Sequence, residues 1–219
     1  PVVTVTASNV NISDFAISYG TSGISVQNST SNWINGNVVT KNKYAGIELL
    51  GSNYTEIAAN IIAFHDNTSL HAQGVWLSSS NSNTISGNMI LNNAWSIDIF
   101  SSSNNIVYDN IISSNYRGAN LESSNNNFFY HNNFINNTDQ ALSYESLNTW
   151  DDGYPSGGNY WSDYTGKDIK SGANQDQPGS DGIGDTPYNI TDGNDQDRYP
   201  LMTLWHPPVD LTPPITTDD

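Results

Sequence analysis

The chain has 219 residues, a formal net charge of −16 and no cysteine. Asn, Ser and Thr make up 77 of these residues, and their side chains compete for backbone hydrogen bonds, which argues against a helical bundle. Six Lys and Arg against 22 Asp and Glu argue against nucleic-acid binding, because phosphates need cationic partners. No apolar run approaches the ~20 residues of a membrane span.

A short pattern recurs after a strand-like segment at 2–6. A small or polar residue precedes Asn, and apolar residues follow it. The reference positions are Asp14, Asn37, Asn60, Asn88, Asn110 and Asn132. They lie 23, 23, 28, 22 and 22 residues apart, and a second apolar segment keeps the same step. One structural unit therefore takes about 22 residues.

Each unit holds three short apolar stretches, separated by Asn, Ser and Gly clusters that make tight turns. Three strands per turn predict a right-handed parallel β-helix with about six coils over residues 1–149. A leucine-rich repeat would show a regular Leu ladder, and an antiparallel meander would need hairpin turns. The fold class is therefore predicted as all-β.

Two features of the coils follow from this period. Strand alternation predicts inward walls formed by Ile24, Ile47, Val75, Ile97, Ala119 and Leu142, and by Val39, Ile62, Ile90 and Ile112. Polar groups in a turn need partners, so amides are expected to stack from coil to coil. The residues expected in this stack are Asn32, Asn53, Asn83, Asn105 and Asn127.

The outward face of the first wall is a candidate carbohydrate-binding site. Alternation places Glu48, Trp76, Asp98 and Asn120 in one outward column. An exposed Trp suits sugar stacking, and two carboxylates on one face suit glycoside hydrolysis. The alternative interpretation is a solvated, partly apolar face, and we name no catalytic residue.

The longest interval contains an insertion with His65, Asp66 and His71. Two His and a carboxylate can bind a transition metal. Histidines in an irregular loop usually face water, so this metal site is an alternative interpretation.

Acidic residues become dense after Asn148, and residues 148–219 carry thirteen acids and three bases. We predict an irregular acidic cap over 150–205, followed by a Pro-rich linker or tail at 206–219. Carboxylates on Gly-bearing loops can converge on calcium, which takes six to eight oxygen ligands. The predicted ligands are Asp176, Asp181, Asp185, Asp192, Asn194, Asp195 and Asp197.

Six N-x-S/T sequons are eligible for glycosylation. They begin at Asn11, Asn28, Asn53, Asn67, Asn136 and Asn189. Random placement of Asn, Ser and Thr predicts a similar number, so the count alone does not indicate modification.

The coils and the segments 148–164, 182–188 and 197–202 resemble NosD-like β-helix repeats of the carbohydrate-binding and sugar-hydrolase type. Such repeats occur in secreted and surface-layer-associated archaeal proteins. The resemblance implies a parallel β-helix in an extracellular or cell-surface setting. It also implies a metal-handling accessory role as one alternative.

Taken together, these patterns favour a structural or adhesive surface module, stabilised by calcium, with glycans or other surface proteins as partners. The unpaired edge of the first coil also allows head-to-tail assembly into a homopolymeric filament. A carbohydrate-active enzyme, either a hydrolase or a lyase, is the alternative, and the residues favour a non-catalytic role.

Overall fold

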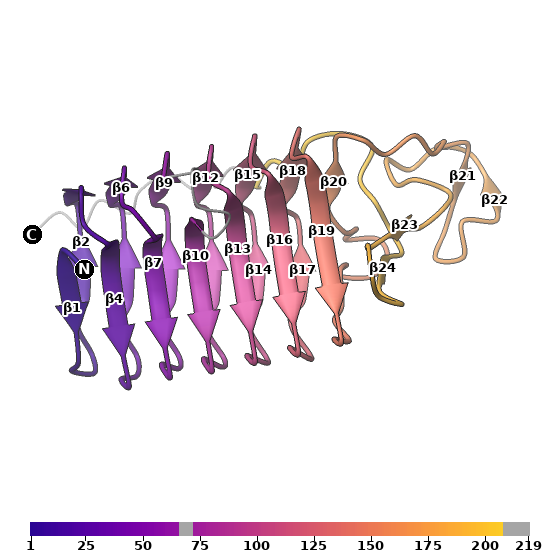
Figure 1. Cartoon of the computed structure of the whole chain (residues 1–219). Coiled ribbons are helices and arrows are strands. Elements are labelled where there is room, and N and C mark those ends of the chain that lie inside the picture. The colour runs from indigo at the N-terminus through magenta and orange to yellow at the C-terminus, as the bar shows by residue number, and fades with distance from the viewer. Residues whose placement is uncertain (66–71, 208–219) are drawn as a thin grey trace, which may run out of the picture.

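A computed structural model describes residues 1–65 and 72–207, which form a rod of parallel strands closed at one end by irregular loops (Figure 1). Three sheets run along the rod. Sheet A contains β1 (Val3–Val5), β4 (Ser22–Gln27), β7 (Ala45–Leu50), β10 (Gln73–Ser78), β13 (Trp95–Phe100), β16 (Arg117–Glu122) and β19 (Asp139–Tyr144). Sheet B contains β2 (Asn11–Ser13), β5 (Trp33–Asn35), β8 (Glu56–Ala58), β11 (Thr84–Ser86), β14 (Ile106–Tyr108) and β17 (Phe128–Tyr130). Sheet C contains β3 (Ala16–Ser18), β6 (Val38–Thr40), β9 (Ile61–Ala63), β12 (Met89–Leu91), β15 (Ile111–Ser113), β18 (Asn133–Ile135) and β20 (Tyr160–Trp161).

The predicted parallel β-helix of about six coils is confirmed, because each strand pairs in parallel with the strand one coil away. Ile47 pairs with Val75 across a step of 28 residues, and Val75 pairs with Ile97 across the ordinary step of 22. Equivalent apolar side chains therefore stack along the axis and are fully buried. No helix in the described part of the chain is long and apolar enough to cross a membrane.

Polar ladders hold the turns between the sheets. The turn between sheets B and C is the most regular, with Asn37, Asn60, Asn88, Asn110, Asn132 and Asn159 at successive coils. Asn60 donates its backbone N–H to Oδ1 of Asn88 at 2.9 Å, and Asn88 does the same to Asn110 at 2.9 Å. The Asn88 Nδ2 group also donates to Ile57 O at 2.8 Å, in the coil before. Each buried amide thus satisfies backbone groups of its neighbours.

Two details of the predicted register are wrong. Ala141 rather than Leu142 faces the core, because Ala119 pairs with Ala141 and Leu142 pairs with Asn120. The ladder between sheets A and B contains Thr55 in place of Asn53, since Thr55 N donates to Oδ1 of Asn83 at 2.8 Å. Asn53 lies outside this ladder and accepts a hydrogen bond from Asn81 N at 2.7 Å.

The segment after β19 closes the last coil by extending all three sheets. Thr149 forms a bridge with Phe128 in sheet B, Thr191 forms one with Leu142 in sheet A, and β20 pairs with β18 in sheet C. Two further pairs of short antiparallel strands lie in this segment. They are β21 (Lys170–Ser171) with β22 (Gln177–Pro178), and β23 (Tyr188–Asn189) with β24 (Gln196–Asp197).

Two buried tryptophans close the core at this end. Trp150 stacks on Phe129 with ring centroids 4.4 Å apart, and Trp161 stacks on Phe134 at 4.3 Å. Both indoles are almost fully buried, so the apolar interior of the rod ends against aromatic rings rather than water.

We predict that Asn88→Ala lowers the free energy of unfolding by roughly 3 kcal/mol, because it leaves Asn60 N–H and Ile57 C=O buried without partners. Urea denaturation measures this change. Asn174→Ala, at an exposed turn of the cap, is the control and should leave stability unchanged. Equal losses in the two variants would contradict a structural role for the ladder.

Candidate functional site

The outward face of sheet A carries the predicted column of polar and aromatic residues. Strand register places Glu48, Trp76, Asp98 and Asn120 side by side on β7, β10, β13 and β16. Although they project from the sheet, Glu48, Asp98 and Asn120 are almost completely buried, with exposed fractions of 7%, 5% and 5%. The adjacent outward column is more exposed and includes Phe100 and Glu122.

A second column, which the sequence did not predict, completes the site. It contains the first residue of each strand, notably Gln73 on β10 and Arg117 on β16. Regular pairing between these strands skips their second residue, a glycine in β7, β10 and β16. The first and fourth residues of a strand therefore lie on the same face, which strict alternation would forbid.

Hydrogen bonds join the two columns into one network. Asp98 accepts from Asn120 Nδ2 at 2.7 Å through Oδ1 and from Gln73 Nε2 at 3.2 Å through Oδ2. Arg117 donates through Nη1 to Asn120 Oδ1 at 2.8 Å and forms an ion pair with Asp139 at 3.4 Å. Among the described residues, this network thus combines two carboxylates, Asp98 and Asp139, with one cation, Arg117.

Glu48 belongs to a separate group. It accepts a hydrogen bond from Ser22 Oγ at 3.0 Å, one coil away on β4. Two strand spacings, about 10 Å, separate the backbones of Glu48 and Asp98, with Trp76 between them. The two carboxylates therefore have different partners rather than a shared one.

Aromatic side chains border the polar network. Tyr44 meets Trp76 edge to face, with ring centroids 5.7 Å apart, and the Arg117 guanidinium lies 5.4 Å from the centre of the Trp95 ring. Phe100 is 42% exposed on the same face. Aromatic surfaces beside amides and carboxylates provide stacking and hydrogen bonding at one place.

Two polar atoms of the network are buried and have no hydrogen-bond partner among residues 1–65 and 72–207. They are Oε1 of Gln73, an acceptor, and Nε of Arg117, a donor. Buried polar groups are normally satisfied, so an unmet donor and an unmet acceptor on one face require a physical explanation. A ligand that carries hydroxyl groups can supply both partners, since a hydroxyl donates and accepts.

His65, part of the metal alternative, is a structural residue of the turn between sheets C and A. It occupies the ladder position between Asn42 and Asn93, accepting from Asn42 N through Nδ1 at 3.1 Å and donating its backbone N–H to Asn93 Oδ1 at 3.2 Å. Burial lowers the pKa of His65 to about 4, so the ring is neutral and able to accept. A Cβ at Gly46 would collide with this ring, which explains the glycine. Asp66 and His71 lie outside the described residues.

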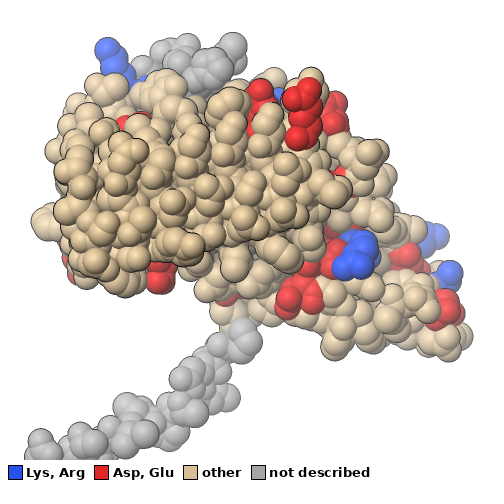
Figure 2. Space-filling view, turned by 90° about the horizontal axis from the view of Figure 1, so that it is seen from below, with Lys and Arg blue, Asp and Glu red and all other residues tan. Residues whose placement is uncertain are grey.

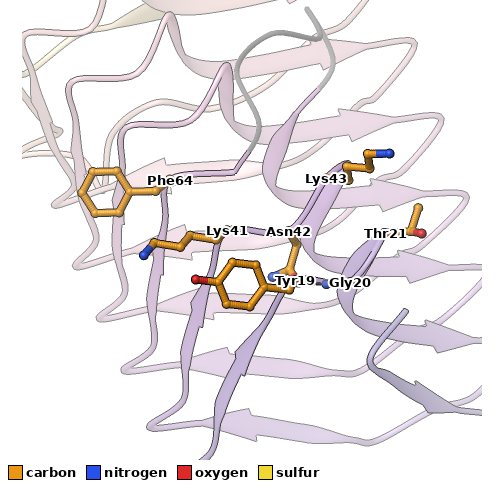
Figure 3. A pocket seen from close by; sticks show the side chains of 7 residues that line it. All are labelled: Tyr19, Gly20, Thr21, Lys41, Asn42, Lys43 and Phe64. Atoms are coloured by element: carbon orange, nitrogen blue, oxygen red, sulfur yellow. Dashed lines mark hydrogen bonds between the residues drawn. The ribbon is translucent and has the colours of Figure 1, made fainter.

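Phe64, the residue before His65, projects outward at that turn (Figure 3). The expectation of an irregular loop at His65 is therefore wrong. The peptide before the insertion still follows the regular turn of the other coils.

Acidic side chains gather towards the cap end of the face shown in Figure 2. Among residues 1–65 and 72–207, no group of three or more His, Cys, Asp or Glu is arranged to hold a metal ion. Asp181 and Asp185 instead accept hydrogen bonds from backbone N–H groups of Gly172 and Lys170. Asp176 accepts from the Gln177 side chain at 2.8 Å. Asp192 and Asn194 are exposed.

Asp195 and Asp197 end two of the ladders. Asn148 N–H donates to Oδ2 of Asp195 at 3.0 Å, and Asn159 N–H donates to Oδ2 of Asp197 at 2.7 Å. In most coils, the corresponding acceptor is the side chain one coil further on, as Asn127 is for Asn105 and Asn132 is for Asn110, so these carboxylates replace a coil that is missing. Calcium binding by the predicted residues stays a prediction.

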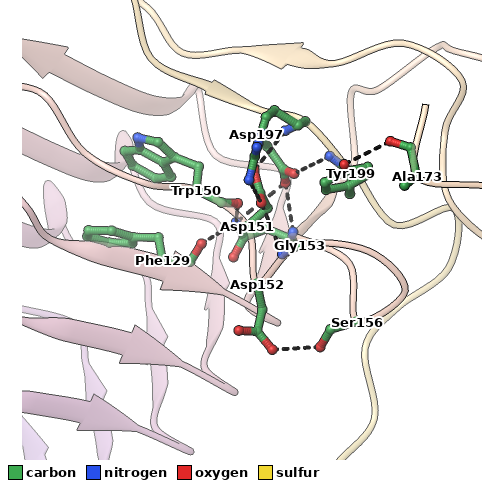
Figure 4. A network of polar contacts seen from close by, with 11 residues as sticks. Phe129, Trp150, Asp151, Asp152, Gly153, Ser156, Ala173, Asp197 and Tyr199 are labelled. Atoms are coloured by element: carbon green, nitrogen blue, oxygen red, sulfur yellow. Dashed lines mark hydrogen bonds and ion pairs between the residues drawn. The ribbon is translucent and has the colours of Figure 1, made fainter. Parts of the chain in front are cut away.

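Asp197 lies at the centre of a polar network within the cap (Figure 4). It also accepts from Trp161 Nε1 at 2.8 Å and Tyr199 N at 3.0 Å. Nearby, Arg198 holds Asp151 with two bonds of 2.9 and 2.7 Å. Burial raises the pKa of Asp197 to about 7, although its N–H donors act in the opposite direction.

The sequons lie at several kinds of position. Four begin at exposed residues, which are Asn11, Asn28, Asn136 and Asn189. Asn53 is half-buried, and Asn67 lies outside the described residues. Glycosylation at these positions stays a prediction.

Comparison with known proteins gives a family and a related fold. The family model described as periplasmic copper-binding protein (NosD) matches residues 2–166. No curated relative matches the chain. A double mutant of the periplasmic alginate epimerase AlgG has a similar fold, with a TM-score of 0.51, 21% identity, and coverage of 76% of this chain and 36% of the epimerase. An alginate lyase from a Paenibacillus strain gives a TM-score of 0.41 and 14% identity, covering 72% of this chain and 85% of the lyase. At these identities the structural likeness concerns the fold alone.

We predict that acidification strengthens the contribution of Asp197 to stability. Its pKa is higher in the folded protein than in the unfolded chain, so this contribution is complete below about pH 4 and is lost as the pH rises through about 7. The stability advantage of the wild type over Asp197→Asn should therefore grow by roughly 2–3 kcal/mol between pH 8 and pH 5. Urea denaturation at several pH values measures it, with Asp176→Asn as the exposed control. A difference that does not vary with pH would contradict the prediction.

Proposed function

The chain belongs to the NosD family, and from this premise we propose that it is an extracytoplasmic carbohydrate-binding module. The family is named for a periplasmic protein, and the similar epimerase is itself periplasmic, which supports a location outside the cytoplasm. The binding surface is the outward face of sheet A, from β7 to β16. The observation that carries this proposal is the buried polar network with its two unmet hydrogen-bonding atoms.

The chemistry of the face supports a sugar as the ligand. Asn, Gln, Asp and Arg side chains offer donors and acceptors in fixed positions, and Trp76 and Phe100 offer flat apolar surface beside them. Sugar hydroxyl groups need the former, and the carbon face of a pyranose ring needs the latter. Because the donor Arg117 and the acceptor Gln73 lie two strands apart, the ligand would run along the rod axis.

The charges of the face favour a neutral glycan. Asp98 and Asp139 bring two carboxylates to the network, Glu48 adds a third on the same face, and Arg117 is the cation of the network that opposes them. A polyanion on this surface would meet carboxylates while the whole chain already carries −16. A neutral chain avoids this repulsion.

Hydrolysis remains a second candidate, because Glu48 and Asp98 flank Trp76 on one face. The backbones of the two strands are about 10 Å apart. In inverting enzymes the two carboxyl groups themselves are ~6.5–9.5 Å apart, so the backbone spacing is of a similar size. Each carboxylate also accepts hydrogen bonds from neighbouring side chains, which favours ligand binding over turnover.

Copper is the ligand in the name of the family, but the described residues do not fit a copper centre. The chain has no cysteine, and no cluster of three or more suitable side chains occurs among the described residues. His65 is committed to a ladder, and His131 stacks on Trp205 at 3.5 Å. We therefore assign no step to copper.

A structural or adhesive role at an archaeal cell surface, with head-to-tail assembly, is compatible with sugar binding. In the described structure the outer edges of β1, β2 and β3 have no neighbouring strand, and such edges can accept another chain. Surface attachment and self-assembly stay proposals beside the binding function.

Calcium also stays a proposal, and its effect on melting tests it. A ligand that binds the folded state alone stabilises by about 2.7 kcal/mol at a hundredfold excess over Kd. We expect chelation to lower the melting temperature, and Asp192→Asn to reduce the calcium-dependent part. Asp14→Asn changes another exposed Asp of positive φ, in the first coil, and serves as the control. A melting temperature that ignores both chelator and millimolar calcium would rule the site out.

We predict that the protein binds neutral oligosaccharides and that Trp76→Ala weakens this binding by about tenfold, through lost stacking. Calorimetric titration with a panel of neutral hexasaccharides measures it. Trp33→Ala is the matched control, because Trp33 is 41% exposed on the outward side of sheet B. Equal loss in both variants, or a wild type that binds no neutral glycan, would refute the proposed site.

A further inference from the structure

A separate cavity of about 460 Å³ lies at the turn between sheets C and A in the first three coils. Figure 3 shows Tyr19, Lys41 and Phe64 placed along this turn, one from each coil, while the Lys43 side chain lies on the other side of Asn42 and points away from them. Cavities of this size suit a ligand as large as one or two sugar rings. The carbohydrate face described above does not include these residues.

The three residues hold an unfavourable backbone conformation. Their φ angles are +63° at Tyr19, +56° at Lys41 and +57° at Phe64, in the left-handed region that large side chains rarely adopt. In the later coils the same turn position is taken by Asn92, Ser114 and Asn136. Asn tolerates this conformation better than Tyr, Lys or Phe do. The first three coils therefore carry backbone strain that an Asn at the same position would reduce.

Burial of the Tyr19 and Phe64 side chains does not offset the energy of this strain. The Tyr19 side chain is 78% exposed and the Phe64 side chain is 54% exposed. Strained residues that add little to the core are commonly retained for a function. Two aromatic rings held in the open at one cavity offer a stacking surface.

The cavity also concentrates positive charge. Lys41 and Lys43 are two of only six Lys and Arg in the chain, and none of the described residues that line the cavity is acidic. Neither ammonium group forms an ion pair with a described residue, and Lys41 Nζ lies 6.0 Å from the centre of the Tyr19 ring. On a protein of net charge −16, two cations on one turn, neither paired with a described residue, attract an anionic group there.

A second cavity provides an internal comparison. It lies at the same turn in the last three coils, has a volume of about 440 Å³, and is lined by uncharged residues such as Asn92, Ser114 and Thr138. The turn itself therefore creates the hollow, and the second cavity also has an exposed aromatic ring, Tyr116, whereas the cations belong to the cavity of the first three coils.

We propose that the cavity formed by Tyr19, Lys41, Lys43 and Phe64 binds an acidic sugar residue. The carboxylate or sulfate group contacts the Lys41 ammonium group, Lys43 adds positive charge from the other side of the turn, and the apolar face of the ring packs on Tyr19 and Phe64. The inference rests on the proposed glycan binding and extends it, because the full ligand would combine neutral units on sheet A with an acidic unit at this turn.

The test is calorimetric titration of the whole chain with oligogalacturonate, a chondroitin sulfate oligosaccharide, a neutral cello-oligosaccharide and inorganic sulfate. We expect an acidic oligosaccharide to bind, and Lys41→Ala/Lys43→Ala to weaken that binding by about tenfold while neutral binding stays unchanged. Lys167→Ala/Lys170→Ala removes two exposed lysines from the cap and is the charge-matched control. The acidic probe that binds more tightly distinguishes a carboxylate from a sulfate.

A third variant separates binding from folding. Tyr19→Asn should raise the melting temperature, because Asn relieves the left-handed strain, while it weakens acidic binding. Equal affinity for acidic and neutral probes, equal affinity for inorganic sulfate, or unchanged acidic binding in the lysine variant would each overturn the inference. If neutral oligosaccharides still bind in any of these cases, the proposed sheet A site is not affected. If acidic oligosaccharides bind and neutral ones do not, the sheet A proposal is refuted and the acidic-sugar site is retained.

Discussion

The fold depends on satisfying the backbone of its turns. Three sharp turns per coil bring N–H and C=O groups into a buried interior, where an unpaired group costs about 1–3 kcal/mol. The Asn ladders satisfy these backbone groups, and their backbone N–H donors point towards the C-terminal end of the rod. Backbone N–H and Nδ2 groups donate towards the following coil, as from Asn60 to Asn88, and Nδ2 also returns a bond to a carbonyl of the coil before. Each coil therefore needs the next one.

This direction creates an end that needs an acceptor. At the last coil Asn148 and Asn159 still present N–H donors with no further coil to receive them. Asp195 and Asp197 supply the acceptors, and two tryptophans cover the apolar interior beside them. An acidic side chain suits this place because its oxygens accept the remaining N–H donors, although burial raises the pKa of Asp197 to about 7. Part of the acidity of the cap therefore has a structural origin.

Because core and turns carry the stability, the outer surfaces are available for other chemistry. The buried network on sheet A and the strained turn of Tyr19, Lys41 and Phe64 both lie outside the apolar interior. Most sheet A strands have a glycine at their second position, and this glycine serves both the buried ladder and the outward face. It leaves room for the ladder side chain within, as Gly46 does for His65, and the strand bends there, so that Gln73 and Arg117 face outward.

The sequence alone determined the period, the parallel β-helix and the outward column of Glu48, Trp76, Asp98 and Asn120, because strand alternation and a 22-residue step are local regularities. It missed Gln73 and Arg117, since the bend at the glycine breaks that alternation. The sequence pattern predicted Leu142 as inward-facing, and this was wrong. Gln140 takes the strand position at which other coils have glycine or serine, so the residue that aligns with Ala119 could not be recognised as Ala141. The roles of Asp195 and Asp197 depended on tertiary structure alone. Their partners Asn148 and Asn159 lie 47 and 38 residues away, and only the closing of the last coil brings these donors to the two carboxylates.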